Sequence, residues 1–122
     1  MKILVAEDEP NIVTSLEFLL RGAGYDVTIA RNGSEALDLT EKLRPDLVLL
    51  DIMLPLVDGF EVCRRIRGNS ATRHTRILML TARGRRGEMD KGMAAGANAY
   101  LTKPFATKEL VETVARLLKT SG

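Results

Sequence analysis

The sequence predicts an α/β protein in which a five-stranded parallel sheet lies between two layers of helices, a three-layer doubly wound arrangement. Short apolar runs alternate along the chain with longer segments of helical periodicity. Most of these runs are apolar throughout, which is typical of parallel strands covered on both faces. The 122 residues show no repeat, low-complexity tract or linker, so we expect one domain over residues 1–122, with right-handed crossovers.

The short apolar runs are the predicted strands. They cover residues 3–6, 27–30, 47–50, 77–80 and 99–101. The run at 47–50, LVLL, is followed directly by Asp51 and then by further apolar residues. Aspartate is rarely buried unless another group pairs with it or a site uses it. Its position at the carboxyl end of the third strand therefore marks Asp51 as a candidate functional residue.

The first two predicted helices follow the first two strands. Pro10 suits the first turn of the first helix, and Gly24 suits its end. The second helix begins near Asn32, which can cap it, with Glu35 placed to reach back from three residues further on. The apolar positions of the first helix recur at helical spacing: Ile12, Leu16, Leu19, Leu20 and Ala23.

Three further helices complete the alternation. The third is predicted from about residue 59 to 67, and the fourth from about 87 to 95, where Gly92 weakens the helical preference. The fifth carries its apolar stripe at Leu110, Val111, Val114, Leu117 and Leu118. Because parallel strands end at one edge of the sheet, and ligands of doubly wound folds bind outside that edge, we expect the site there.

Composition narrows the function classes. The chain is 45% apolar and 28% charged, and its formal charge of +2 is too small to indicate nucleic-acid or membrane binding. The single cysteine, Cys63, cannot form an internal disulfide and reads as a small core residue. The N-terminus becomes acidic after a short apolar run, unlike a signal peptide, and no run is long enough to span a bilayer. A cytoplasmic domain is the expectation.

Polar side chains follow several predicted strands where each one ends. Glu7 and Asp8 follow the first strand, and Asp51 follows the third. Two carboxylates about 4 Å apart repel by about 4 kcal/mol at an effective dielectric constant of about 20, so such a cluster suits a bound cation. Oxygen ligands, few in number, favour Mg²⁺. The sequence therefore predicts a magnesium site at this edge.

The remaining polar groups at the same edge suit a phosphoryl group. Lys103 follows the fifth strand, and we expect it to neutralise a phosphoryl oxygen rather than to pair with one carboxylate. Thr81 and the backbone N–H of Ala82 supply further donors. Asp51 is then the central carboxylate, and a carboxylate can accept a phosphoryl group as an acyl phosphate.

The motifs VAEDEP, PDLVLLDIMLPLVDGFEV, LTA and YLTKPF resemble the receiver domain of two-component response regulators, over essentially the whole chain. The resemblance implies a flavodoxin-like fold with strand order 2-1-3-4-5. It also implies a phosphorylation-activated switch that accepts a phosphoryl group from a sensor histidine kinase onto Asp51. Such a domain takes part in its own phosphorylation and dephosphorylation but is not an enzyme, and it binds neither nucleic acid nor membrane directly.

The resemblance also assigns roles to individual residues. Mg²⁺ would be held by Asp8, Asp51 and the backbone carbonyl of Met53, with Glu7 assisting. Lys103 and Ala82 would bind the phosphoryl group, and a cis peptide bond would join Lys103 to Pro104. Thr81 and Tyr100 would form a switch pair that changes the surface of the fourth helix, fifth strand and fifth helix. Met53 and Arg83 would flank the path of an attacking water.

Simpler interpretations exist for each residue. Asp51 could be a cap, Glu7 and Asp8 a solvated loop, and Lys103 a surface lysine. We favour a shared functional site over these roles because all four residues are expected to converge at one edge of the sheet. Thr81 could simply end a strand, but we favour a functional role for it. Tyr100 could be a half-buried packing residue of a strand, and only the resemblance to the family assigns it a role in the switch. Structural roles are the expectation for the remaining polar candidates: Asp58 and Gly59 as a turn and helix cap, and His74 and the arginines of ARGRRGEMDK as solvated loop residues.

Two other functions use a similar sheet. A haloacid-dehalogenase-like phosphatase would carry a second aspartate two residues after the nucleophile, where this chain has Met53, and would have a cap domain. A flavodoxin-like electron carrier would need a phosphate-binding loop after the first strand, where the acidic run beginning at Glu7 repels anions. The chain ends at LLKTSG after the fifth helix, so a stand-alone regulator and the receiver of a longer protein with an unknown output both remain open.

The fourth helix, fifth strand and fifth helix differ from the corresponding surface of the winged-helix transcription factors of this family. Those usually carry an acidic pair before the strand-five aromatic, where this chain has Asn98 and Ala99, and an arginine where it has Thr113. We therefore expect that phosphorylation does not produce the charge-laced dimer of that subclass. A different partner, or a dimer with apolar contacts through Met89 and Met93, is the expectation.

Overall fold

The computed structural model describes residues 1–82 and 86–119. Its strands form one five-stranded parallel sheet in the order β2-β1-β3-β4-β5, which confirms the predicted fold class and the strand order that the resemblance implies. The strands are β1 (Lys2–Ala6), β2 (Asp26–Ala30), β3 (Leu47–Asp51), β4 (Arg76–Ala82) and β5 (Ala99–Lys103).

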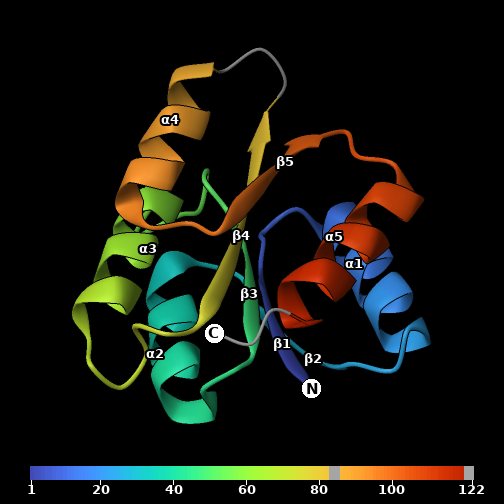
Figure 1. Cartoon of the computed structure of the whole chain (residues 1–122), viewed down its shortest axis with the longest axis horizontal. Helices are drawn as coiled ribbons and strands as arrows, with labels where there is room; N and C mark the ends of the chain where they lie inside the picture. The colour runs from blue at the N-terminus through green and yellow to red at the C-terminus, as the bar shows by residue number, and fades with distance from the viewer. Residues whose placement is uncertain (83–85, 120–122) are drawn as a thin grey trace.

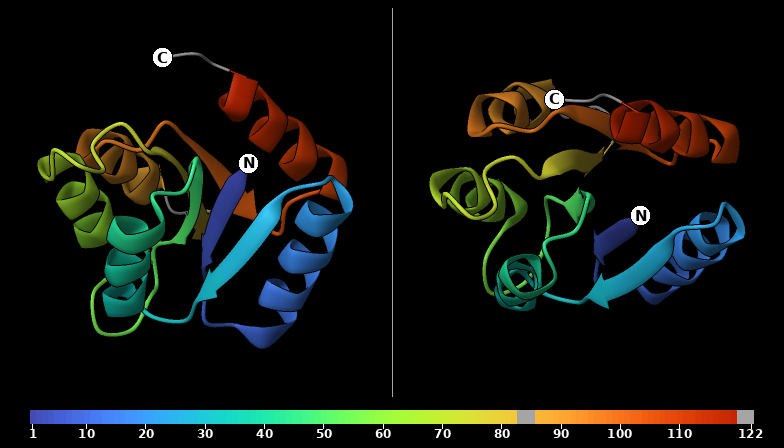
Figure 2. Two further views of the ribbon diagram at one scale, coloured as in Figure 1. Left: turned by 90° about the horizontal axis from the view of Figure 1, so that it is seen from below. Right: turned by 60° about the horizontal axis from the view of Figure 1, so that its bottom comes forward.

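Helices cover both faces of the sheet (Figure 1). Two of them, α1 and α5, lie together on one face, and the other three lie on the opposite face, as both views of Figure 2 show. The helices are α1 (Pro10–Gly22), α2 (Gly33–Leu43), α3 (Gly59–Gly68), α4 (Arg86–Ala95) and α5 (Thr107–Lys119). The arrangement is the predicted three-layer one, with βα units in strict alternation.

Strand residues alternate between two separate cores. Leu4 packs in the core beneath α2, α3 and α4, whereas its neighbour Val5 packs in the core beneath α1 and α5. In β3 the same alternation places Leu50 in the first core and Leu49 in the second. Because both neighbours are buried, the strand sequences are apolar throughout rather than alternating.

The strands extend beyond their predicted bounds. Most of the added residues are polar or charged, including Lys2, Asp26 and Arg76. A polar side chain at a strand end can face solvent while its backbone still hydrogen-bonds to the neighbouring strand, so hydrophobicity alone does not mark the end. The extension of β4 to Ala82 and of β5 to Lys103 matters most, because it makes Thr81 and Lys103 part of the sheet.

Side-chain caps fix the helix starts near the site. The Asn32 side chain accepts a hydrogen bond from the Glu35 N–H at 2.7 Å, as predicted, and the Glu35 carboxylate accepts from the Arg31 N–H at 3.2 Å. Asp58 caps α3 through the Glu61 N–H at 3.0 Å, in agreement with its predicted structural role.

Among the helices of the described residues, none is long and apolar enough to cross a bilayer.

Candidate functional site

The carboxyl edge of the sheet brings three acidic side chains together. Asp51 is the last residue of β3, and Glu7 directly follows β1, the strand beside it. Carboxylate oxygens of Glu7, Asp8 and Asp51 all lie within 4.8 Å of one another. Glu7 and Asp51 are 1% and 5% exposed, whereas Asp8 is exposed. The predicted convergence of these residues is therefore present.

Backbone and side-chain donors hold Glu7 in the cluster. Its Oε2 accepts hydrogen bonds from the N–H groups of Asp8, at 3.1 Å, and Glu9, at 3.2 Å. Its Oε1 accepts from Lys103 Nζ at 2.6 Å. Burial raises the pKa of Glu7, and the nearby charge of Asp51 adds to this, although the Lys103 hydrogen bond acts in the opposite direction. The carboxylate is thus buried but well provided with donors.

Lys103 supplies the positive charge of the site. Its Nζ lies 3.3 Å from Asp51 Oδ1 as well as 2.6 Å from Glu7. Burial disfavours the charged ammonium, but the hydrogen bond to Glu7 and the charges of Asp51 and Glu7 outweigh burial and raise the pKa of Lys103. The sequence interpretation favoured a phosphoryl oxygen over a single carboxylate as its partner, and in this structure the lysine bridges two carboxylates. The expected cis peptide bond between Lys103 and Pro104 is present.

The other predicted residues surround this cluster at different depths. Thr81 is 2% exposed, and its hydroxyl donates to the carbonyl of Ala82 at 3.2 Å. The Met53 N–H donates to Asp51 Oδ1 at 3.3 Å, while the Met53 side chain is 65% exposed. Tyr100 lies on β5 with a 39% exposed side chain. Arg83, the other residue expected beside the path of an attacking water, lies outside the described residues.

The loop after β3 is fixed by unusual backbone contacts. The carbonyl of Pro55 accepts from the N–H of Val57 at 2.9 Å and from that of Gly33, the first residue of α2, at 3.0 Å. Leu56, between Pro55 and Val57, has a φ of +71° and an 80% exposed side chain. The i→i+2 hydrogen bond and this φ describe a strained γ-turn. A Cβ at Gly33 would lie 1.8 Å from the Val57 carbonyl oxygen, so only glycine fits where α2 meets this turn.

The chemistry of the donors fits a magnesium ion. Carboxylate oxygens from Glu7, Asp8 and Asp51 converge, and the exposure of Asp8 leaves this side of the cluster open to water. Mg²⁺ retains several waters and takes one or two carboxylates, which such a half-open acidic cluster offers. Lys103 is shared by two of these acids, so within the group formed by Glu7, Asp8, Asp51 and Lys103 negative charge is in excess.

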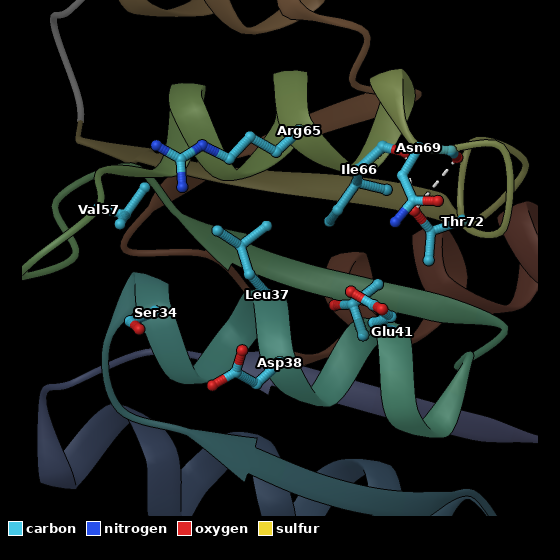
Figure 3. Close-up of a pocket in the computed structure, with 10 residues that line it drawn as sticks. Ser34, Leu37, Asp38, Glu41, Val57, Arg65, Ile66, Asn69 and Thr72 are labelled. Carbon is cyan, nitrogen blue, oxygen red and sulfur yellow. Dashed lines mark hydrogen bonds between the residues drawn. The ribbon is translucent and has the colours of Figure 1, made fainter.

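Two hollows of the surface lie at different distances from this chemistry. A groove of about 330 Å³ separates α2 from α3, with Asp38 and Glu41 on one side and Arg65 and Asn69 on the other (Figure 3). None of the acidic cluster lines it. A more apolar crevice of about 490 Å³ lies between α1 and the loop after β5, and Lys103 forms part of its wall. The second hollow therefore adjoins the cluster.

Sequence reasoning missed a second partly buried cation, at the opposite edge of the sheet. Arg67 of α3 donates hydrogen bonds to Gly96 and Asn98 in the loop before β5. It also donates to the carbonyls of Arg73 and Thr75 in the loop before β4. The sequence RRIR gives no sign of this, because its arginines look alike and only the folded chain shows which of them is turned inward. Other structural interpretations are confirmed: Cys63 is fully buried, and His74 is exposed.

Comparisons with known proteins agree with the geometry. A family model described as the response regulator receiver domain matches residues 3–115. The alkaline phosphatase synthesis transcriptional regulatory protein PhoP of Bacillus subtilis is 44% identical over 120 residues, which are 98% of this chain and 49% of that protein. The chain spans about half the length of the curated relatives it matches.

Solved structures give the same picture. The receiver domain of a sensor histidine kinase from Pseudomonas aeruginosa, solved with a magnesium ion coordinated in its active site cleft, is 37% identical with a TM-score of 0.91 over 98% of both chains. The chemotaxis response regulator CheY4 of Vibrio cholerae is 35% identical with a TM-score of 0.89, over 95% of this chain and 97% of that one.

Proposed function

The chain belongs to the response regulator receiver domain family, whose members act in phosphorylation-dependent two-component signalling, and we propose that Asp51 is its phosphoacceptor. The observation that carries this proposal is the position of Asp51. It is 5% exposed, lies within 4.8 Å of two further carboxylates and lies 3.3 Å from a lysine ammonium. A buried carboxylate among like charges needs a specific use.

The proposed reaction transfers a phosphoryl group from a histidine of a sensor kinase. A carboxylate oxygen of Asp51 attacks phosphorus, the phosphorus–nitrogen bond breaks, and the imidazole leaves with the bonding electrons. The ammonium of Lys103 offsets charge on one phosphoryl oxygen, and the Thr81 hydroxyl and Ala82 N–H donate to others. Lys103 must then exchange part of its present contact with Glu7 for the phosphoryl group.

We assign Glu7, Asp8, Asp51 and the backbone carbonyl of Met53 as the residues that would hold Mg²⁺. The ion would neutralise negative charge on the phosphoryl oxygens. The half-open acidic cluster supports this assignment, as does the magnesium ion in the related kinase receiver domain. Binding is expected to be weak, because water supplies most ligands.

We propose that Thr81 and Tyr100 transmit the modification. Thr81 moves its hydroxyl from the Ala82 carbonyl, 3.2 Å away, toward the phosphoryl group. The ring of Tyr100, now 39% exposed, turns into the space behind it. This changes the surface formed by α4, β5 and α5, which an output domain or downstream protein then recognises.

The proposed domain, residues 1–122, is a phosphoacceptor that takes part in its own phosphorylation and dephosphorylation, not an enzyme that turns over a separate substrate. We place it in the cytoplasm, where ATP is available to phosphorylate the sensor kinase. The half-length match to transcriptional regulators leaves the output open. No feature of the described residues favours the phosphatase or electron-carrier alternatives: Met53 replaces the second aspartate, and Glu7 lies where a flavin phosphate would bind.

Intact-mass measurement tests the phosphoacceptor directly. The protein is incubated with acetyl phosphate and Mg²⁺, and a gain of one phosphoryl group is expected. Asp51→Asn should show no gain, whereas Asp38→Asn, which alters an exposed aspartate of α2, should behave as wild type. The assignment is wrong if Asp51→Asn gains the same mass as wild type.

A further inference from the structure

The loop between β3 and α3, residues 52–58, is fixed at both of its ends. Near its start, the Met53 N–H donates to Asp51 Oδ1 at 3.3 Å. At its end, the N–H of Gly59, the first residue of α3, donates to the Ile52 carbonyl at 2.9 Å. A Cβ at Gly59 would lie 2.5 Å from the Asp51 carbonyl oxygen, so α3 begins directly against the end of β3. The loop that carries Met53 therefore starts and finishes beside Asp51.

The middle of the loop is held by the start of α2. The Pro55 carbonyl accepts from the N–H groups of Val57 and Gly33. A Cβ at Gly33 would lie 1.8 Å from the Val57 carbonyl oxygen and 2.7 Å from Val57 Cβ. Figure 3 shows Val57 at the end of the groove where α2 begins, near Ser34. Gly33 does not have a positive φ, so its need for glycine comes from this close approach and not from its own backbone conformation.

Proline limits where a displacement of this turn can be absorbed. The ring of Pro55 fixes its φ, and Leu54, which precedes a proline, is restricted to extended conformations. The Leu54 side chain is 6% exposed and packs in the core beneath α2, α3 and α4. A displaced turn therefore tilts Leu54 and Pro55 together about the buried side chain. The Met53 carbonyl belongs to the peptide bond that joins Met53 to Leu54, so this tilt reorients it.

We propose that Gly33 is a positioning residue for the metal site. The start of α2 fixes the turn at residues 55–57, and this turn fixes the Met53 carbonyl relative to the acidic cluster. The inference rests on the proposed function, because that function assigns the Met53 carbonyl to Mg²⁺. Gly33 belongs to a helix that contributes none of the proposed ligands. Groups that orient the ligands of a metal typically change its affinity about 10–100-fold when they are altered.

A titration with Mg²⁺ alone, followed through the amide resonances of Asp8 and Asp51, tests the inference without a phosphodonor. Gly33→Ala should weaken Mg²⁺ binding about tenfold, because the turn must shift to admit the Cβ. Gly22→Ala is the matched control, since a Cβ at this glycine of α1 would meet nothing within 4 Å, and it should bind Mg²⁺ as the wild type does. Equal Mg²⁺ affinity of folded Gly33→Ala and the wild type would overturn the inference.

A change on the exposed side of the turn decides the matter if Gly33→Ala does not fold. Leu56 has a φ of +71° and an 80% exposed side chain, and proline fixes φ at about −65°. Leu56→Pro therefore excludes the turn without removing buried packing, and it should also weaken Mg²⁺ binding about tenfold. Leu56→Ala, which removes the same exposed side chain, is the control and should retain the wild-type affinity. Wild-type affinity in Leu56→Pro would refute the role of the turn.

Phosphorylation separates this inference from the proposed function. At saturating Mg²⁺, Gly33→Ala should gain a phosphoryl group from acetyl phosphate as the wild type does, whereas Asp51→Asn should not. A loss in Gly33→Ala that saturating Mg²⁺ does not restore would contradict a role through the metal. If the wild type binds Mg²⁺ but gains no mass, the proposed phosphoacceptor fails, while the titrations still decide the role of Gly33. If Mg²⁺ shifts no resonance of Asp8 or Asp51 in the wild type, the metal assignment and this inference fail together.

Discussion

Lys103 and Arg67 are partly buried cations at opposite edges of one sheet, and their surroundings differ in kind. Lys103 lies at the carboxyl edge among carboxylates, 2.6 Å from Glu7 and 3.3 Å from Asp51. Arg67 lies at the amino edge and donates to backbone carbonyls and to the side-chain oxygen of Asn98. One cation is shared among excess negative charge, and the other satisfies neutral acceptors.

The difference separates reactivity from stability. At the carboxyl edge, three acids lie within 4.8 Å of one another, so like charges repel and the arrangement is receptive to a cation or to charge rearrangement. At the amino edge, the loss of one guanidinium would remove the side-chain donor of the partly buried carbonyls of Gly96 and Thr75. Substitutions at the first edge should therefore affect chemistry more than folding, and substitutions at the second edge the reverse.

The largest expected effect is the loss of Mg²⁺-dependent phosphorylation in Asp8→Ala. Removal of this exposed carboxylate should lower Mg²⁺-dependent phosphorylation by acetyl phosphate at least about 100-fold, because it removes a proposed metal ligand. The free energy of unfolding without Mg²⁺ should stay equal or rise slightly, since repulsion with Glu7 and Asp51 is relieved. Intact mass and urea denaturation measure the two quantities. A marked loss of stability together with normal phosphorylation would reverse the distinction between the edges.

The second effect is the converse one, in Arg67→Ala. Loss of the donor to the partly buried carbonyls of Gly96 and Thr75 should lower the free energy of unfolding by about 2–3 kcal/mol, measured by urea denaturation. Arg65→Ala should cost less than about 1 kcal/mol, because its ion pair with Glu61 is solvent-exposed. Phosphorylation of the folded Arg67→Ala protein by acetyl phosphate should persist. Equal costs for the two arginines would mean that the network of Arg67 contributes nothing special.

A smaller effect is expected at the rim of the carboxyl edge. Met53 has a 65% exposed side chain, and its N–H lies 3.3 Å from Asp51 Oδ1. Met53→Ala removes apolar cover beside the proposed acyl phosphate and should change its hydrolysis rate several-fold, with little change in stability. Decay of the added mass after removal of acetyl phosphate measures the rate, and Phe18→Ala, on the exposed side of α1, serves as the control. Decay at the wild-type rate would contradict the prediction.

The smallest expected effect concerns assembly. Changes at the carboxyl edge should not produce a charge-laced dimer, because Asn98 and Ala99 stand where acidic partners would be needed. Sedimentation velocity should show no tight dimer with beryllofluoride and Mg²⁺ at micromolar protein. The outcome against this prediction is a dimer that charge reversal at Lys91 and Glu109 disrupts. A dimer unaffected by those changes but lost in Met93→Glu, at a 45% exposed side chain, would indicate apolar contacts instead.

The sequence was informative where one residue type had one structural use. Local patterns predicted three kinds of feature correctly. Hydrophobicity predicted buried strands such as LVLL, capping preference predicted Asn32 and Asp58, and position at a strand end predicted the acids around Asp51. The partners of Lys103 were not predicted from the sequence. A lysine near three acids can reach several of them, and only the distances in the folded protein show which ones it contacts. The networks of Arg67 and the turn at Leu56 depend on contacts between distant segments, which no local pattern encodes.

The division of the interior into two cores has a consequence for how the family can diverge. Leu4 and Val5 are neighbours in sequence, yet they pack against different helices, and the sheet lies between them. A volume change on one side of β1 has to be accommodated by partners on that side alone. Compensating substitutions should therefore covary within each core and drift independently between the two, so α1 and α5 can exchange packing residues without any adjustment in α2, α3 or α4.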